Sequence, residues 1–267
     1  MYKYTAGFIG AGNMGGALAE AACGAIDPGK VIVSCKTESH AVEIAHRLKC
    51  DSGSAADVVR NSKFVFLGVK PQAFREVADE LSSDFGLSEC IIVSMLAGVS
   101  IDTLEDVFGK DRKIIRIMPN TPCSVGNGVM LLSKNSRVSD EDLEEFKNLM
   151  SKSGVIDEIP EKFIDAASAV SGCGPAFAYM FIEALADGGV KCGLPRKNAL
   201  YYAAHMLIGS AEMVLKTGKH PEELKDAVCS PGGSTIEGVH ALESGAFRCS
   251  AIDAVESAYI KTKELGK

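Results

Sequence analysis

The sequence predicts an α/β fold, in which a doubly wound N-terminal domain is followed by an all-α domain. Three observations support this prediction. Short apolar runs alternate with helical patterns through the first part of the chain, a glycine-rich turn joins the first run to the first helix, and the residues after Pro160 read as helices only. We therefore expect one domain over residues 1–160 and a second over residues 161–267, in a chain long enough for two.

Each expected strand is an apolar run of five or six residues, which is a usual length for a buried strand in a parallel sheet. Residues 14–24 and 38–48 carry apolar side chains at helical spacing between the first strands. Ser54 and Asp57 stand at capping-box spacing, which predicts the start of another helix. The expected strands are residues 5–9, 31–35, 64–69, 91–95, 114–118 and 128–132, with a further short one at 155–159.

The second half consists of helical patterns separated by Gly or Pro. Two of them, residues 176–190 and 199–215, are apolar on nearly all sides, so a small bundle in one chain cannot bury them. We therefore expect a C-terminal dimerisation domain and an obligate homodimer interleaved through residues 161–267. The expected helices are residues 163–169, 176–190, 197–217, 222–228 and 251–265.

Composition narrows the possible partners to small molecules and other proteins. The net charge of -7 and a pI near 5.3 argue against nucleic acid, which clustered Lys and Arg must neutralise. No apolar run approaches the roughly 20 residues that span a bilayer, so we expect no membrane partner. Glycine-rich turn chemistry begins at residue 7, which leaves no room for a leader and predicts a cytoplasmic protein.

The nine cysteines are odd in number, with no C-x-x-C pair and no histidine at metal-ligand spacing. We expect them to be reduced and mostly buried, acting as small hydrophobic side chains, and we expect no metal site.

The turn Gly10-x-Gly12-x-x-Gly15 lies between an apolar run and an Ala-rich helical pattern, which is the context of a Rossmann-like dinucleotide site. Gly10 permits the tight turn, Gly12 lets the backbone approach a pyrophosphate, and Gly15 lets the helix pack on the strand. Asn13 and Met14 stand at the helix start, where free N–H groups favour an anion. A plain glycine-rich connection remains the alternative.

The choice of cofactor depends on the end of the second expected strand. NAD sites place an acid there to bind the ribose hydroxyls, whereas a 2′-phosphate requires hydroxyls or a cation. Here Ser34 and Lys36 occupy this position, and no acid follows before Glu38. This favours NADPH, with NADH possible, although Lys36 could also be a solvated loop lysine.

Several further motifs make the pattern more specific: "FLGVKPQ" (66–72), "SMLAGVS" (94–100), "RIMPNTP" (116–122), "AVSGCGPAFAYMFIEALADGGVKCGLPR" (169–196) and "SPGGSTIEG" (230–238). Together with the glycine turn, they resemble the pyrroline-5-carboxylate reductases over essentially the whole chain, in the family's order. The resemblance implies hydride transfer from NAD(P)H to the C=N carbon of 1-pyrroline-5-carboxylate, giving L-proline in the last step of proline biosynthesis. It also implies intertwined homodimers that often gather into decamers, with the active site formed between two subunits.

The resemblance also assigns residues beyond the turn to the cofactor. Val69, Lys70 and Pro71 follow a buried strand, so they fall at the edge of the sheet where ligands bind, with Val69 and Pro71 lining the nicotinamide. Ala97 and Asn120 each follow a strand end as well, and the Asn120 amide could bond the ribose or the carboxamide.

Substrate binding is expected at the second glycine loop. The backbone N–H groups of Gly232 and Gly233 can converge on the substrate carboxylate, with the hydroxyls of Ser230 and Ser234 beside them. Thr235 would bond the ring nitrogen as a positioning group, because an iminium substrate already carries its proton and catalysis is mainly orientation. Outside this context, "SPGG" would read as the end of a helix and a turn.

The chain departs from the family pattern at three places: Ala55, where Asn is frequent, Cys173 in "CGPA", and Ser234 in "GST". The first leaves the adenine-side contacts open. A β-hydroxyacid dehydrogenase, with Lys191 or Lys197 as proton shuttle, is the alternative enzyme, and a silent NADP(H) sensor is the alternative outside enzymes. His205 reads as a packed or interface residue, and Cys173 and Cys229 read as structural.

Overall fold

The computed structural model describes residues 2–265 and shows two compact units. The first contains the residues up to Cys173 together with those from Ala258 onward, and the second contains Gly174–Ser257. In a single chain, therefore, the division falls at residue 173, whereas the sequence analysis places a domain boundary at residue 160. That boundary stays a prediction for the assembled protein.

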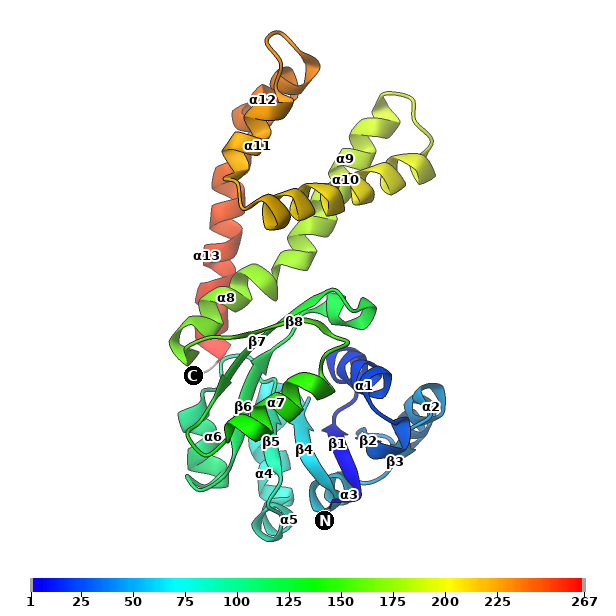
Figure 1. The fold of residues 1–267 in the computed structure, drawn as a ribbon, viewed down its shortest axis with the longest axis vertical. Helices are drawn as coiled ribbons and strands as arrows, with labels where there is room; N and C mark the ends of the chain where they lie inside the picture. The colour runs from blue at the N-terminus through cyan, green and yellow to red at the C-terminus, as the bar shows by residue number, and fades with distance from the viewer. Residues whose placement is uncertain (1, 266–267) are drawn as a thin grey trace. The chain divides into compact units, whose positions relative to one another are not determined.

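The first unit is built on one sheet of eight strands in the order β3-β2-β1-β4-β5-β6-β7-β8, as Figure 1 shows. Neighbouring strands pair in parallel, except β6 and β7, which are antiparallel. The order reverses between β1 and β4, as in other doubly wound sheets. The strands are β1 (Tyr4–Ile9), β2 (Val31–Ser34), β3 (Asp51–Ser52), β4 (Ser62–Leu67), β5 (Ile91–Ser94), β6 (Ile114–Met118), β7 (Gly128–Lys134) and β8 (Gly154–Glu158).

Helices cover both faces of this sheet, because successive strand residues point to opposite sides. Phe8 and Phe66 stack on one face at 4.3 Å between ring centroids, under α1 (Asn13–Ala25), α2 (Glu38–Leu48) and α7 (Asp140–Leu149). Ile9 and Leu67 point to the other face, under α3 (Ala55–Asn61), α4 (Phe74–Glu80), α5 (Ser82–Leu87) and α6 (Ile101–Phe108). The fold class predicted for this half is confirmed.

The predicted elements of the first half agree with the structure to within two residues at each end. The capping box is confirmed, since the Asp57 N–H donates to Ser54 Oγ and the Ser54 N–H donates to the Asp57 carboxylate, both at 3.1 Å. Strand β3 has two exposed residues and was not predicted. The unit also includes α8 (Ile164–Ser171) and the end of α13 (Phe247–Leu265).

The second unit is entirely helical, as predicted. It contains α9 (Gly174–Lys191), α10 (Arg196–Thr217), α11 (Pro221–Val228), α12 (Ser234–Ser244) and the first part of α13. Helices α9 and α10 pack against each other through Ala186, Ala199 and Ala203. Helix α12 was not predicted, because its sequence contains a central Gly and all its residues stay at least partly exposed.

Of two expectations from composition, the absence of a membrane partner stays a prediction, and the burial of most cysteines is wrong. The helical stretch Glu161–Lys191 is long and apolar enough to cross a membrane by length and composition, since an 18-residue window within it has a mean hydropathy of 1.3. A single such helix is weak evidence, since packed helices of soluble proteins pass the same test. All nine cysteines are free, but only Cys90 and Cys123 are buried, and Cys192 and Cys249 are exposed on the helical unit.

Candidate functional site

The glycine turn follows the end of β1 and leads directly into α1. Gly10 has a φ of +89°, which L side chains rarely adopt, and a Cβ there would lie 2.7 Å from the Gly68 carbonyl oxygen. A Cβ on Gly15 would clash with the Gly10 carbonyl oxygen. The Gly10 and Ala11 N–H groups donate to the Ser34 carbonyl at 2.9 and 3.2 Å, which ties the turn to β2. Packing within the protein therefore accounts for two of the three glycines.

Gly12 is different, because nothing in the protein requires a glycine there. Its backbone has a φ of -73° and a ψ of -153°, and no atom lies within 4 Å of the position that a Cβ would take. Gly12 is also the N-cap of α1, whose first turn contains no acidic residue. The open space therefore lies where free N–H groups and the positive end of the helix dipole would meet an anion. This arrangement fits a dinucleotide pyrophosphate.

A cavity of about 1210 Å³ opens beside this turn, at the carboxyl ends of β1, β2 and β4. It lies at the point where the strand order reverses, which is the usual ligand site of a doubly wound sheet. Its volume exceeds the roughly 300–1000 Å³ of common small-ligand pockets. Candidate cofactor residues along its wall are Gly10, Gly12, Ser34, Lys36, Val69 and Lys70. The structure thus brings together candidate residues from three separate segments of the chain, after β1, β2 and β4.

The segment after β2 contributes a lysine, Lys36, to this cavity, and the first acidic residue along the chain is Glu38. Ser34 is buried, whereas Lys36 is exposed and makes no ion pair with any residue that the structure describes. Glu38, the first residue of α2, lines the same cavity. A phosphate near Lys36 would therefore meet a free ammonium group, with a carboxylate two residues away.

The side of the cavity nearest α3 is formed by Gly53, Ser54, Ala55 and Asp57. Two hydrogen bonds from Ser54, from its side chain and its backbone N–H, lower the pKa of the Asp57 carboxyl. The polar side chains of Ser54 and Asp57 are thus hydrogen-bonded to each other within the capping box, and Ala55 contributes only a methyl group. A planar base bound here would meet backbone and small side chains.

Other predicted cofactor residues do not line this cavity. Met14 is half-buried in the first turn of α1, and Ala97 is half-buried in the turn after β5. The side chain of Pro71 lies outside the described residues. Their contacts with a cofactor stay predictions.

Asn120 is buried, and both ends of its amide are bonded within the first unit. Its Nδ2 donates to the Ser171 carbonyl at 2.9 Å, and its Oδ1 accepts from the Val129 N–H at 2.9 Å. Asn120 therefore joins the end of β6 to β7 and to the end of α8. Its contact with a cofactor stays a prediction, and it would depend on the second N–H or the second lone pair of an amide that already bonds within the protein at both ends.

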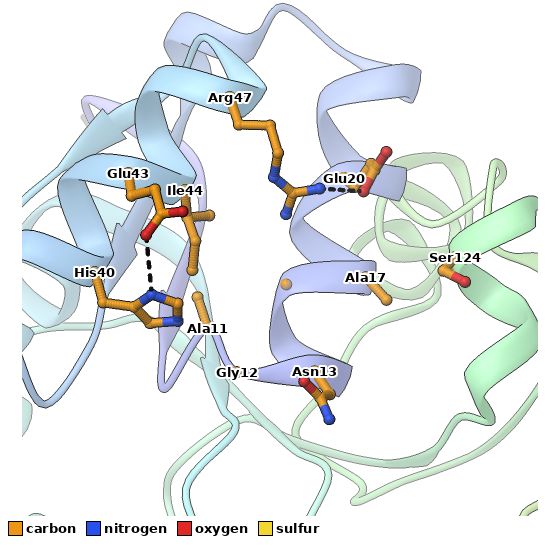
Figure 2. Close-up of a pocket in the computed structure, with 11 residues that line it drawn as sticks. Ala11, Gly12, Asn13, Ala17, Glu20, His40, Glu43, Ile44, Arg47 and Ser124 are labelled. Atoms are coloured by element: carbon orange, nitrogen blue, oxygen red, sulfur yellow. Dashed lines mark hydrogen bonds and ion pairs between the residues drawn. The ribbon is translucent and has the colours of Figure 1, made fainter.

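A second, smaller cavity of about 330 Å³ lies between α1 and α2 and was not anticipated from the sequence. Gly12 and Asn13 form its lower edge, as Figure 2 shows, and Ser124 comes from the turn after β6. Arg47 of α2 and Glu20 of α1 form an ion pair at 3.2 Å across its upper part, and His40 and Glu43, 3.6 Å apart, lie along the α2 side. Arg47 is paired with Glu20, and Glu43 adds a second carboxylate, so the cavity has no net attraction for an anion.

The second glycine loop lies in the helical unit. Gly232 has a φ of +68°, and the Gly233 N–H donates to the Ser230 carbonyl at 3.0 Å. A Cβ on Gly233 would clash with Ser230 Oγ, so a side chain there would require Ser230 to rotate. Gly233 is the N-cap of α12, which makes Ser234 and Thr235 the first two helical residues rather than loop residues. Their N–H groups and hydroxyls lie at the exposed N-terminus of a helix, a suitable position for a carboxylate.

Comparison with known proteins agrees with this arrangement. A family description for pyrroline-5-carboxylate reductase dimerisation matches residues 161–265, and one for NADP oxidoreductase, coenzyme F420-dependent, matches residues 5–98. Pyrroline-5-carboxylate reductase 3 of Danio rerio is 41% identical over 268 residues, covering 100% of this chain and 93% of that protein. This chain belongs to the pyrroline-5-carboxylate reductase family.

Other members of the reductase family support the same assignment. The reductase of Escherichia coli is 40% identical over 264 residues and is covered to 98%, as is this chain. The crystal structure of the Plasmodium falciparum reductase with NADP bound is 33% identical, has a TM-score of 0.88 and covers 100% of both chains. The resemblance inferred from the sequence is confirmed, and the β-hydroxyacid dehydrogenase alternative is set aside. The chain has the NAD(P)H-dependent oxidoreductase fold of this reductase family.

Proposed function

We propose that this chain reduces 1-pyrroline-5-carboxylate to L-proline with NADPH, as the last step of proline biosynthesis. Its whole-length identity of about 40% to reductases of this name supports the reaction. The observation in the structure that carries the proposal is the open space at Gly12, in front of α1 and beside the 1210 Å³ cavity. A protein without a bound dinucleotide would have no use for a glycine there.

The residues of the cavity hold and select the cofactor. N–H groups at the start of α1 bind the pyrophosphate, and Lys36 binds the 2′-phosphate, with Ser34 at the same strand end. Val69 and Lys70 lie on the nicotinamide side, together with Pro71 and Ala97. NADPH bound in this way supplies the hydride. NADH fits the same site without the phosphate contact, so it serves as a weaker cofactor.

The start of α12 holds the substrate. Backbone N–H groups of Gly232, Gly233 and Ser234 surround the carboxylate, and the hydroxyls of Ser230 and Ser234 donate to it. Thr235 Oγ1 bonds the ring nitrogen and fixes the face of the C=N bond that receives the hydride. No side chain needs to act as a strong acid, because the iminium form already carries its proton. The protein contributes orientation, which can supply a large part of a rate enhancement.

The helical half forms a homodimer, and dimers assemble further into a decamer. The match of residues 161–265 to a dimerisation domain supports the first step. So do the large apolar side chains that stay exposed in one chain, including Met180, Tyr201, Ile208 and Leu215. Burial in such an interface also accounts for the apolar stretch Glu161–Lys191 without a membrane, which is compatible with the cytoplasmic location expected from the sequence.

The direct test is the loss of NADPH absorbance on addition of racemic 1-pyrroline-5-carboxylate, with proline identified as product. Turnover with NADPH, and slower turnover with NADH, is the expected result. Hydroxyisobutyrate with NADP⁺ serves as a control for β-hydroxyacid dehydrogenase activity and should give no reaction. Binding of NADPH without turnover of any imine would instead indicate a sensor.

A further inference from the structure

One arginine of strand β6 is almost completely buried. Arg116 is 3% exposed, and an arginine is rarely buried to this degree unless it is paired. Its Nη1 donates to Glu161 Oε1 at 3.0 Å, and its Nη2 donates to Asp165 Oδ1 at 2.6 Å. Glu161 lies just before α8, and Asp165 lies in the first turn of that helix. Arg116 therefore fixes the start of α8 on the sheet.

The same carboxylates bind two further segments of the first unit. Glu161 Oε1 also accepts from the Ile101 N–H at 2.7 Å, which ties the start of α6 to this place. Asp165 Oδ2 lies 3.7 Å from Lys263 Nζ, near the end of α13. We call Arg116, Glu161, Asp165 and Lys263 the Arg116 cluster. It joins β6, α6, α8 and α13.

The cluster lies on both segments through which the chain passes between the two units. The chain leaves the first unit after Cys173, which follows α8, and returns to it at Ala258, within α13. Helix α8 is held at its start by the Arg116 cluster, and at its end by Asn120, whose Nδ2 donates to the Ser171 carbonyl. The end of α13 is held by the cluster alone among these contacts. One buried side chain thus helps to fix both connections.

Stability is a weak reason for such a cluster. Removing charges from water offsets much of their attraction, and apolar replacements of a buried ion pair are often as stable. Arg116 also buries an Nε that has no hydrogen-bond partner among the residues that the structure describes, which is a further cost. What the guanidinium provides is geometry, because its planar fork holds two carboxylates in fixed directions.

We propose that Arg116 is a positioning residue for hydride transfer, which it affects by holding α8 and α13. This inference rests on the proposed function, in which the first unit binds NADPH and the second binds the substrate. The segments that connect the two units must then help to bring the nicotinamide and the C=N carbon to a fixed distance. Arg116 does not line the cofactor cavity, so loosening it should slow hydride transfer without weakening NADPH binding.

The test compares R116K with R137K in the full-length protein. Lysine keeps the charge of Arg116 but cannot bond both carboxylates as a fork. R116K should lower kcat by about tenfold or more, because small misplacements of the reactants slow the reaction strongly, while the Kd of NADPH stays within about twofold. The oligomer mass should not change. R137K alters an exposed ion pair with Asp111 and should change none of these values.

An isotope effect shows which step has changed. With NADPH deuterated at the transferred position, the isotope effect on kcat should be larger in R116K than in the wild type, because hydride transfer has become slower relative to product release. Hydrogen exchange gives a readout that requires no substrate. Amides of residues 164–171 should exchange faster in R116K, while those of β1 and β4 stay protected.

Two further variants decide the matter where R116K folds poorly. D165N keeps the shape of the side chain but removes the charge that Arg116 and Lys263 share, so kcat should fall as in R116K. K263M affects only the α13 side, at a residue that is half exposed, and should lower kcat by about two- to threefold.

The proposal is overturned if folded R116K and D165N keep the kcat of the wild type. It is also overturned if kcat falls only together with NADPH affinity or oligomer mass, since Arg116 would then have a purely structural role. Absence of turnover in the wild-type protein would reject the proposed function itself, and that assay comes before any variant is made.

Discussion

The two units of this chain bury their apolar side chains to very different degrees. In the first, the sheet buries large residues such as Phe8, Phe64 and Phe66 almost completely between two helical layers. In the second, the buried residues among those described are only Ala186, Ala199 and Ala203, while Met180 and Leu215 are 71% and 82% exposed. The first unit thus buries its apolar core within one chain, whereas the second requires a partner surface to bury its apolar side chains.

The positions of the exposed apolar residues on α10 also indicate that the second unit requires a partner surface. At 100° per residue, Tyr201, Ile208 and Leu215 form one exposed apolar stripe, and Tyr202, Met206 and Met213 form another. A narrow polar strip that includes Glu212 and Lys216 separates the two stripes, and the alanines that pack against α9 lie on the opposite side. Two apolar stripes on one helix indicate contact with more than one neighbouring element.

The largest expected effect comes from a charge in one of these stripes. I208D should give a monomer and lower reductase activity by about a hundredfold or more, because a buried unpaired carboxylate is costly in an interface. K216D introduces the same residue on the polar strip and should leave assembly intact. Light scattering at micromolar concentration gives the mass of each variant.

The same variant tests whether the first unit is self-sufficient. If it is, monomeric I208D should still bind NADPH with an affinity within a few fold of the wild type. Loss of NADPH binding together with assembly would show that the first unit also depends on the partner. An active monomer would contradict the dependence of the second unit on a partner.

The next largest effect concerns chemistry in the second unit without a change in assembly. T235A should lower kcat/KM for 1-pyrroline-5-carboxylate by about ten- to a hundredfold, which corresponds to one lost hydrogen bond to a charged group. NADPH affinity and oligomer mass should not change. T235S keeps the hydroxyl and should recover much of the activity.

Full activity in T235A would place the substrate elsewhere. If T235A instead lowers NADPH affinity by the same factor as kcat/KM, the variant would no longer distinguish a cofactor-binding unit from a substrate-binding loop. The site would then have to be sought around residues 171–175.

The first unit offers a pair of glycine variants that separate binding from folding. G12A places a methyl group in space that is open in the protein, so it should leave Tm unchanged and raise the KM for NADPH by about tenfold. G15A forces a methyl group against the Gly10 carbonyl and should lower Tm. Thermal unfolding with and without NADPH distinguishes these outcomes. A fall in Tm for G12A without cofactor would show that Gly12 has a role in folding.

Sequence patterns predicted an element or a turn correctly where the conformation depends on residues that are near neighbours in the chain. Apolar runs predicted seven strands, and glycine spacing predicted the turn that borders the cavity, because both depend on local sequence. Strand β3 was missed since two exposed polar residues, Asp51 and Ser52, carry no apolar signal. Helix α12 was missed for a related reason, because its apolar residues face no core within one chain.

Contacts between distant segments could not be predicted in this way. Asn120 was expected at the cofactor, but its amide bonds Val129 and Ser171, and nothing near residue 120 specifies those partners. The cavity between α1 and α2 is also a product of how these helices pack, and the ion pair between Arg47 and Glu20 across it follows no motif.

The smallest expected effect is on cofactor choice, and it tests whether one exposed residue of the first unit selects NADPH. K36E replaces the free ammonium in the cavity with a carboxylate that repels the 2′-phosphate. Because the position is exposed and screened by salt, we expect the NADPH/NADH ratio of kcat/KM to fall by about three- to tenfold. The effect should shrink as ionic strength rises. K30E makes the same charge change just before the opposite end of β2 and should not alter the ratio. An unchanged ratio in K36E would assign the selection to Ser34 and the backbone, so that even cofactor choice would depend on the buried part of this unit rather than on its surface.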